Sequence, residues 1–152
     1  MTCSPVEPAW VHRPPPPPDP DVLAVWAWEL HAAVDLTVSR RRLGAEAYGL
    51  GRPATEMEED IERLLLAYEE LASNGFRHGR APVRAQVTAS PRGWLIDVTD
   101  AAPETSPVPA VDRDPALGGL GMHLIARLSD AHGWSVEGGR KHVWAYLGAT
   151  RA

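Results

Sequence analysis

The chain has 152 residues, 44% of them hydrophobic, and it carries 15 basic and 20 acidic side chains for a formal net charge of -5. This length suits one domain, and the apolar fraction is sufficient for a core. The basic residues are scattered apart from the run Arg40–Arg42, so the sequence lacks the cationic stripe that a nucleic acid backbone requires. We therefore expect one globular unit that does not bind nucleic acid directly.

The N-terminal region contains the single cysteine, Cys3, so the sequence offers neither an internal disulfide nor a thiolate metal site. The same region lacks the apolar segment of a signal peptide, and no apolar run approaches the ~20 residues that cross a bilayer. We expect a cytoplasmic protein without a membrane partner.

Residues 1–20 include the run Pro14–Pro18, which favours extended polyproline geometry and supplies no backbone N–H donors to a helix or sheet. We assign residues 1–20 to a flexible, proline-rich tail and residues 21–152 to the folded domain. The tail is either a solvated spacer or a ligand of the SH3-binding type.

The first two elements of the predicted domain are a strand and a helix. Apolar residues alternate along residues 21–30, which predicts a strand with one buried face. Residues 35–51 carry apolar positions near helical spacing and end in Gly49 and Gly51, which suit a helix C-terminus. The run Arg40–Arg42 belongs either to the solvated face of this helix or to a cationic site for a nucleotide or a partner.

A long second helix is predicted over residues 54–78. Thr55 and Glu58 have the spacing of a capping box, and further acidic residues lie at the positive end of the helix dipole. The apolar positions of the helix form a stripe that faces a core. They are Ile61, Leu64, Leu65, Tyr68, Leu71 and Ala72.

Three polar residues of this helix, Glu70, Asn74 and His78, recur at intervals of four on a stripe oblique to the apolar one. Such a stripe is either a solvated face or one side of a site. A site is favoured by Asp100, which closes a row of alternate apolar positions in a later strand, because a core-facing carboxylate requires a partner.

The second half of the chain predicts two hairpins separated by a loop and a helix. Residues 81–90 and 93–100 form the first hairpin, and residues 134–149 form the second, which turns on a Gly-Gly pair. Residues 101–117 contain several prolines and are predicted to form a loop. Residues 118–133 are predicted to form a third helix with a glycine-rich start.

The entry sequence GGLG is either a tight turn or a backbone cradle for an anion such as phosphate, which the N–H groups at a helix start attract. The order of elements, β-α-α-β-β-α-β-β, predicts an α+β fold. We expect a two-layer α/β sandwich in which a mixed, mainly antiparallel sheet is covered on one face by helices.

These elements occur in the order of a known superfamily. The sequence EELASNGFRHG resembles the N box of the GHKL (Bergerat-fold) ATP-binding superfamily, VTD with its following loop resembles the first glycine box, and GGLGMHLI resembles the second. The sequence GGRKHVWAYL resembles the terminal strand of the short anti-sigma factor serine/threonine kinases of bacterial partner-switching systems. The resemblance covers residues 22–148 and implies the histidine-kinase-like ATPase type of sandwich.

The resemblance implies roles for individual residues, with ATP and Mg²⁺ as cofactors. Glu70 would orient or deprotonate the attacking hydroxyl, and Asn74 would hold the Mg²⁺ that bridges the triphosphate. Asp100 would accept the adenine amino group. The other nucleotide-binding positions would be the flanking His78, together with Ala102, Gly119, Leu120 and Gly121 of the two glycine boxes.

The implied function is that of an ATP-dependent kinase that phosphorylates a small antagonist protein, sequesters a sigma factor and can form a homodimer. Ala102 and Glu104 stand where the first glycine box has its two glycines, which favours an alternative function, a regulatory ATP-binding module without catalysis. A sensor histidine kinase is a third reading, weakened because no phosphoacceptor helix pair precedes the domain.

Overall fold

The computed structural model describes residues 10–50, 54–103 and 120–149, and for residues 54–57 and 120–123 it describes the backbone alone. Within these ranges the secondary structure follows the predicted order. The elements are β1 (Ala24–Leu30), α1 (Ala33–Tyr48), α2 (Ala54–His78), β2 (Val83–Ser90), β3 (Gly93–Asp100), α3 (Leu120–Leu128), β4 (Ala131–Glu137) and β5 (Arg140–Gly148).

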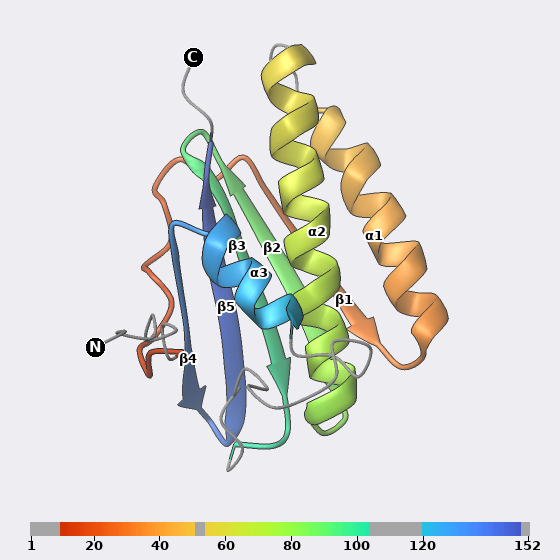
Figure 1. The fold of residues 1–152 in the computed structure, drawn as a ribbon, viewed down its shortest axis with the longest axis vertical. Helices are drawn as coiled ribbons and strands as arrows, with labels where there is room; N and C mark the ends of the chain where they lie inside the picture. The colour runs from red at the N-terminus through yellow and green to blue at the C-terminus, as the bar shows by residue number, and fades with distance from the viewer. Residues whose placement is uncertain (1–9, 51–53, 104–119, 150–152) are drawn as a thin grey trace, which may run out of the picture.

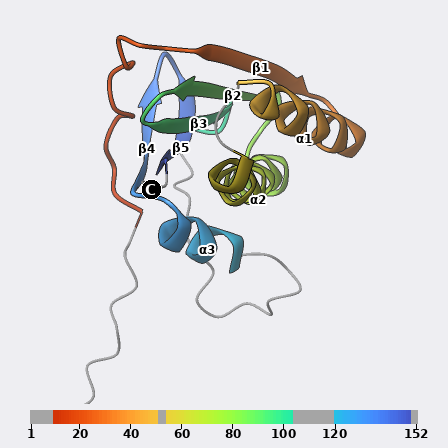
Figure 2. The same cartoon turned by 90° about the horizontal axis from the view of Figure 1, so that it is seen from above.

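The five strands form one sheet in the order β1-β2-β3-β5-β4, and neighbouring strands pair antiparallel throughout. The three helices of the described chain lie on one face of this sheet, with α2 between α1 and α3 (Figure 1 and Figure 2). The predicted α+β two-layer sandwich is therefore confirmed, and it is consistent with a histidine-kinase-like ATPase fold.

Alternate residues of the strands point toward the helices and build the core, as the period of a strand requires. On β3 this row includes Ile96, Val98 and the predicted core-facing Asp100, all at most 1% exposed. The register across β3 and β5 places Asp100 opposite Lys141. The core-facing row therefore ends on two charged residues.

Helix α2 supplies the opposite wall of the core. The predicted apolar stripe is buried apart from Leu65, which is half-buried. At its middle, the Tyr68 hydroxyl donates to Ser39 Oγ of α1 at 2.6 Å, and the Tyr68 ring packs edge-on against Trp28 of β1. Burial raises the pKa of Tyr68 to about 12. Tyr68 therefore links α2 to both α1 and the sheet.

Helix α1 ends at Tyr48, and the N–H of Gly49 donates back to the Ala45 carbonyl at 3.2 Å. Within the arginine run, Arg40 is half-buried and its Nε lies 3.3 Å from Glu69 Oε2 of α2. The other two arginines of the run are exposed. The run thus contributes one cross-helix ion pair and a solvated face.

Helix α3 is shorter than predicted, because it ends at Leu128 rather than near residue 133. The hydroxyl of Ser129 donates to the Ile125 carbonyl at 2.6 Å and closes the last turn. From Ala131 onward the chain pairs with β5, and this cross-strand pairing outweighs the local helical periodicity. None of the described helices is long and apolar enough to cross a membrane.

Residues 10–20, which the sequence assigns to a tail, lie on the side of the sheet away from the helices (Figure 2). Trp10 is only 6% exposed and belongs to the core cluster. His12 forms a parallel bridge with Trp134 at the outer edge of β4. The segment preceding the prolines still has N–H donors, which explains how it pairs with a strand although the prolines cannot.

Candidate functional site

Four chain segments meet at one end of the molecule. The C-terminal half of α2, the end of β3, the start of β5 and the start of α3 all lie toward the bottom of Figure 1. Most of the residues that the sequence singles out are located in these segments. The fold therefore brings together residues from four separate stretches of sequence.

Asp100 lies at the centre of this end. It is 1% exposed, and its Oδ2 atom lies 3.4 Å from Nζ of Lys141, which is 2% exposed. A buried carboxylate without a cation is costly, and an ion pair offsets much of that cost. Lys141 thus compensates the charge of Asp100 inside the core.

Two glycines bring α2 down onto the sheet beside Asp100. A Cβ on Gly75 would lie 3.1 Å from Val98 Cγ1 and 3.2 Å from Val83 Cγ1. A Cβ on Gly79 would lie 2.6 Å from both Cγ and Oδ2 of Asp100. Residues four apart lie on one side of a helix, so this glycine pair lets the end of α2 rest directly on the carboxylate.

Ala102 stands where the resemblance expects a glycine. It is 4% exposed, and its N–H donates to Asp100 Oδ1 at 2.7 Å. Among the described residues only glycines have a positive φ, so Ala102 keeps an ordinary backbone conformation without strain. The alanine is therefore compatible with the local fold, whereas Glu104 lies outside the described residues.

The polar stripe of α2 changes along its length. Glu70 and Asn74 are half-buried, whereas His78, the last residue of the helix, is exposed. Burial raises the pKa of the Glu70 carboxyl, the neighbouring Glu69 carboxylate raises it further, and Arg77 opposes both. A raised pKa makes a carboxylate a better proton acceptor near neutral pH. The stripe is thus partly desolvated at the two residues predicted to act.

The predicted glycine-rich entry is described in part. Gly119 lies outside the described residues, while Leu120 and Gly121 form the first turn of α3. The first N–H groups of a helix have no partners within that helix and carry a partial positive charge. A helix start suited to an anion therefore falls within the predicted cradle sequence, and it lies beside the C-terminal half of α2 (Figure 1).

Sequence reasoning assigned no role to Lys141 or Gly79. Lys141 alternates with the apolar Val143 and Ala145, and the same period that marks Asp100 as core-facing also marks Lys141. Gly79 follows Gly75 at helical spacing, which is a signal for close helix contact. Their contact with Asp100 could not be predicted from the local sequence, because the Lys141 contact requires β5 to lie beside β3 in the sheet.

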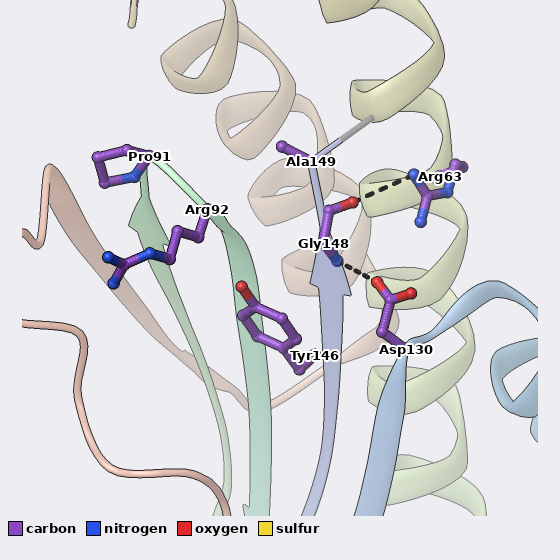
Figure 3. Close-up of a pocket in the computed structure, with 7 residues that line it drawn as sticks. All are labelled: Arg63, Pro91, Arg92, Asp130, Tyr146, Gly148 and Ala149. Carbon is purple, nitrogen blue, oxygen red and sulfur yellow. Dashed lines mark hydrogen bonds between the residues drawn. The ribbon is translucent and has the colours of Figure 1, made fainter. Parts of the chain in front are cut away.

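A separate hollow of about 670 Å³ lies at the opposite end of the sheet (Figure 3). There Arg63 of α2 donates to the Gly148 carbonyl at 3.4 Å, and the Gly148 N–H donates to Asp130 Oδ2 at 2.5 Å. Gly148 pairs with Gly93 at the start of β3, whereas Asp100 is the last residue of that strand. The hollow is therefore remote from Asp100. The side chains of Arg63 and Asp130 thus hold the end of β5 in place through Gly148.

ATP with Mg²⁺ fits the residues at the Asp100 end. Each carboxylate oxygen has two lone pairs, so Asp100 can accept an adenine amino group in addition to the Ala102 N–H and the Lys141 ammonium. The amide oxygen of Asn74 is the hard type of ligand that Mg²⁺ accepts. Within the described ranges, no three His, Cys, Asp or Glu side chains gather as they would around a transition metal.

Residues 31–147 match a protein family described as the Histidine kinase-like ATPase domain. The matched range includes the described helices α1, α2 and α3, both hairpins up to Leu147 and every residue discussed above at the Asp100 end. No curated protein matches the chain in sequence. Membership of this family implies ATP binding, typically with Mg²⁺. The chain belongs to the histidine kinase-like ATPase domain family of the GHKL superfamily.

Proposed function

We propose that the chain is a cytoplasmic, ATP-dependent serine/threonine protein kinase of a bacterial partner-switching system. The observation that carries this proposal is the contact between the buried Asp100–Lys141 pair and the glycine end of α2. Glu70 and Asn74 belong to the same helix. Helix α2 therefore carries the candidate catalytic groups, and its C-terminal end contacts the candidate base-recognition residue Asp100.

Asp100 selects the base in this proposal. Its carboxylate accepts a hydrogen bond from the amino group of adenine, whereas guanine presents a carbonyl oxygen at the equivalent position and would be repelled. Lys141 keeps the buried carboxylate compensated while it makes this bond. Ala102 holds the second carboxylate oxygen through its N–H and thereby fixes the orientation of Asp100.

Asn74 would hold Mg²⁺ through its amide oxygen, which is the hard type of ligand that this ion accepts. When bound, Mg²⁺-ATP supplies the phosphoryl group together with charge neutralisation for its transfer. Leu120 and Gly121 would present backbone N–H groups to the phosphates at the start of α3, and the resemblance assigns the same role to Gly119. His78, exposed one turn beyond Asn74, flanks them.

Glu70 positions the acceptor hydroxyl and takes its proton. Phosphoryl transfer relies on positioning more than on covalent chemistry, so a half-buried carboxylate one turn from the Mg²⁺ ligand suits this role. Its raised pKa, caused first by burial, favours proton acceptance near neutral pH.

The partners follow from the resemblance of the terminal strand. The acceptor is a serine or threonine of a small antagonist protein, and a sigma factor is the competing partner. A second candidate function, an ATP-binding regulatory module without catalysis, is favoured by Ala102 in the first glycine box. The unstrained backbone of Ala102 supports the kinase instead.

Thermal unfolding with and without Mg²⁺-ATP tests the nucleotide site. At 100 times the dissociation constant, binding stabilises the folded state by about 2.7 kcal/mol, which shifts the midpoint by several degrees. Mg²⁺-GTP should give a clearly smaller shift because of Asp100. A missing shift with Mg²⁺-ATP, together with no heat of binding in calorimetry, would contradict the nucleotide site itself.

Phosphotransfer from labelled ATP to candidate antagonist proteins of the same genome separates the two functions. Glu70→Ala should keep most of the ATP affinity and lower transfer by about 10²-fold or more. Asn74→Ala should lower binding and transfer together, because it removes the Mg²⁺ ligand. ATP binding without labelling of any antagonist, combined with capture of a sigma factor, would support the regulatory module.

A further inference from the structure

The sheet face that the helices leave uncovered carries residues 10–20, which we name the strap (Figure 2). The strap begins beside β4, where the Trp134 N–H donates to the Val11 carbonyl at 3.1 Å and the Arg13 N–H donates to the Trp134 carbonyl at 2.9 Å. The next residues, Pro14–Pro18, have no N–H to donate. They leave the edge of β4 and line a groove on the uncovered face.

Trp144 of β5 holds the start of the proline run. Its indole N–H donates to the Arg13 carbonyl at 3.0 Å, and the Arg13 guanidinium carbon lies 5.3 Å from the centre of the Trp144 ring. The same guanidinium donates to the His132 carbonyl at 3.2 and 3.0 Å. Aromatic grooves that bind polyproline helices work in this way, because such helices leave their own carbonyls without internal partners.

Gly133 of β4 leaves room for the strap. A Cβ at this position would lie 2.9 Å from the Val11 carbonyl oxygen, 3.0 Å from Arg13 Cγ and 3.0 Å from Trp144 Cζ2. Gly133 does not have a positive φ, so its missing side chain matters for space rather than for backbone conformation. The sheet is thus shaped to admit an extended segment here.

The far end of the proline run is held by charge. Asp19 Oδ2 lies 3.3 Å from Nη1 of Arg92, which lines the same groove as Tyr146. Between the two anchors the prolines form one wall of the groove, and a space of about 730 Å³ remains there, with Leu95 of the sheet among its other lining residues. Residues 11–18 are all exposed or half-buried. The strap is therefore fixed at both ends, and its prolines are not part of the core.

We propose that the sheet surface beneath this groove is a recognition site for proline-rich segments of a partner protein, and that the strap covers it in cis. The bound strap defines the chemistry of the partner segment: a basic residue before the prolines, seated on Trp144, and an acidic residue after them, paired with Arg92. Polyproline II segments suit such exchange because they lose little conformational entropy on binding. The groove lies on the face opposite the helices, so the proposal does not depend on the kinase assignment.

The strap acts as an intramolecular competitor. A short tether gives a cis ligand an effective concentration of about millimolar, so a free peptide gains access to the groove only when the strap is weakened. Replacing all five prolines of Pro14–Pro18 by serine in the full chain removes the polyproline geometry and leaves Trp10 in place. The core is untouched by this change, because none of the prolines is buried.

The test measures binding of a fluorescent peptide with the sequence VHRPPPPPDP, residues 11–20, by anisotropy. The proline-to-serine variant should bind it at least about tenfold more tightly than the wild-type chain does. Arg13→Ala in the otherwise wild-type chain loosens the first anchor and should also admit the peptide. A peptide with serines in place of the five prolines should bind neither protein.

Matched arginine variants on the proline-to-serine background locate the site. Arg92→Ala removes the partner of the acidic residue and should weaken peptide binding, whereas Arg84→Ala removes an exposed arginine paired with Glu29 elsewhere on the sheet and should not. Gly133→Ala should weaken binding further, by filling the space beneath the peptide. Equal peptide affinity in wild type and both strap variants, or equal effects of Arg92→Ala and Arg84→Ala, would overturn the proposal.

Discussion

Two buried carboxylates lie at opposite ends of the sheet, and their cationic partners differ. Asp60 is 1% exposed and lies 3.3 Å from Arg63, whose guanidinium also donates to the Leu128 carbonyl at 3.2 Å. Asp100 is equally buried, but its partner is the ammonium of Lys141. The arginine fork joins α2 to backbone groups of other elements and acts as a clamp.

The Lys141 ammonium is a compact charge on the strand next to Asp100, and it compensates the carboxylate without such a fork. In the proposed function, the Asp100 carboxylate uses its remaining lone pairs to accept a hydrogen bond from the ligand. The comparison teaches that a buried carboxylate alone does not identify a binding site. The two buried carboxylates differ in the shape of the cation beside them, a forked guanidinium for Asp60 and a single ammonium for Asp100.

The largest effect is expected from Asp100→Leu, which leaves Lys141 buried without its carboxylate. Loss of one member of a buried ion pair costs about 3–5 kcal/mol, so the free energy of unfolding measured in urea should fall by that amount. The double variant Asp100→Leu/Lys141→Met should recover most of the stability but no ATP binding. Recovery of ATP binding in the double variant would show that the pair is a structural clamp like the Asp60 pair.

A smaller loss is expected from Arg63→Met at the other end. The Leu128 and Gly148 carbonyls and Asp60 lose a donor, but Arg63 is partly exposed and water can replace part of the contact, so the cost is about 1–3 kcal/mol. The dissociation constant for Mg²⁺-ATP, measured by calorimetry well below the unfolding temperature, should stay within about twofold. A large loss of ATP affinity would remove the distinction between the two ends.

The pH dependence of stability sharpens the assignment of Glu70. Its pKa is raised on folding, so the native state binds protons more readily than the unfolded state, and ionisation toward neutral pH lowers the stability of the wild type. Glu70→Gln should therefore be the more stable protein at pH 7, by less than about 1 kcal/mol because the group is only half-buried.

This gain should disappear below about pH 4, where the unfolded carboxyl is also protonated. Urea unfolding of both proteins at pH 7 and at the lowest pH that keeps them folded measures the difference. A stability gain that does not change with pH would indicate a packing effect instead. The same variant should lose phosphotransfer, so stability and activity should move in opposite directions.

The smallest effect is expected on the uncovered face, where His142 Nδ1 lies 3.0 Å from Asp97 Oδ2 in a half-exposed pair. The hydrogen bond that the His142 ring donates to the Asp97 carboxylate raises the pKa of His142, while burial opposes the shift. This stabilisation is fully present below about pH 6.5 and is lost as pH rises through the folded pKa. Asp97→Asn should thus be less stable than wild type near pH 5.5, by less than about 1 kcal/mol, and nearly equal to it at pH 9. A stability difference between Asp97→Asn and wild type that stays constant across this pH range would contradict the titration of His142.

Much of the fold could be predicted from local periodicity. The bounds of α2 coincide with the predicted residues 54–78, because a wide apolar stripe and acidic first residues act within one continuous segment. The hairpin turns were also predictable, since Gly138 and Gly139 take positive φ values of 58° and 76°. Asp100 could be placed in the core from alternation alone.

The remaining features depend on contacts between segments far apart in sequence. The β3–β5 register that gives Asp100 its lysine follows from strand order rather than from either strand. The path of the strap depends on Trp144 and Gly133, which lie more than a hundred residues after the prolines. Composition predicted the polyproline geometry but could not reveal the surface on which it rests.

The position of β5 in the sheet determines when the sheet can be completed during synthesis. This strand is the last of the sheet to be made, yet it lies between β3 and β4. Until residues 140–148 have left the ribosome, β3 has an open edge and Asp100 has no lysine beside it. The nascent chain can therefore form helix α2 long before the Asp100–Lys141 pair of the proposed nucleotide site exists. A premature stop before Lys141 would leave a chain with the helix but without the site.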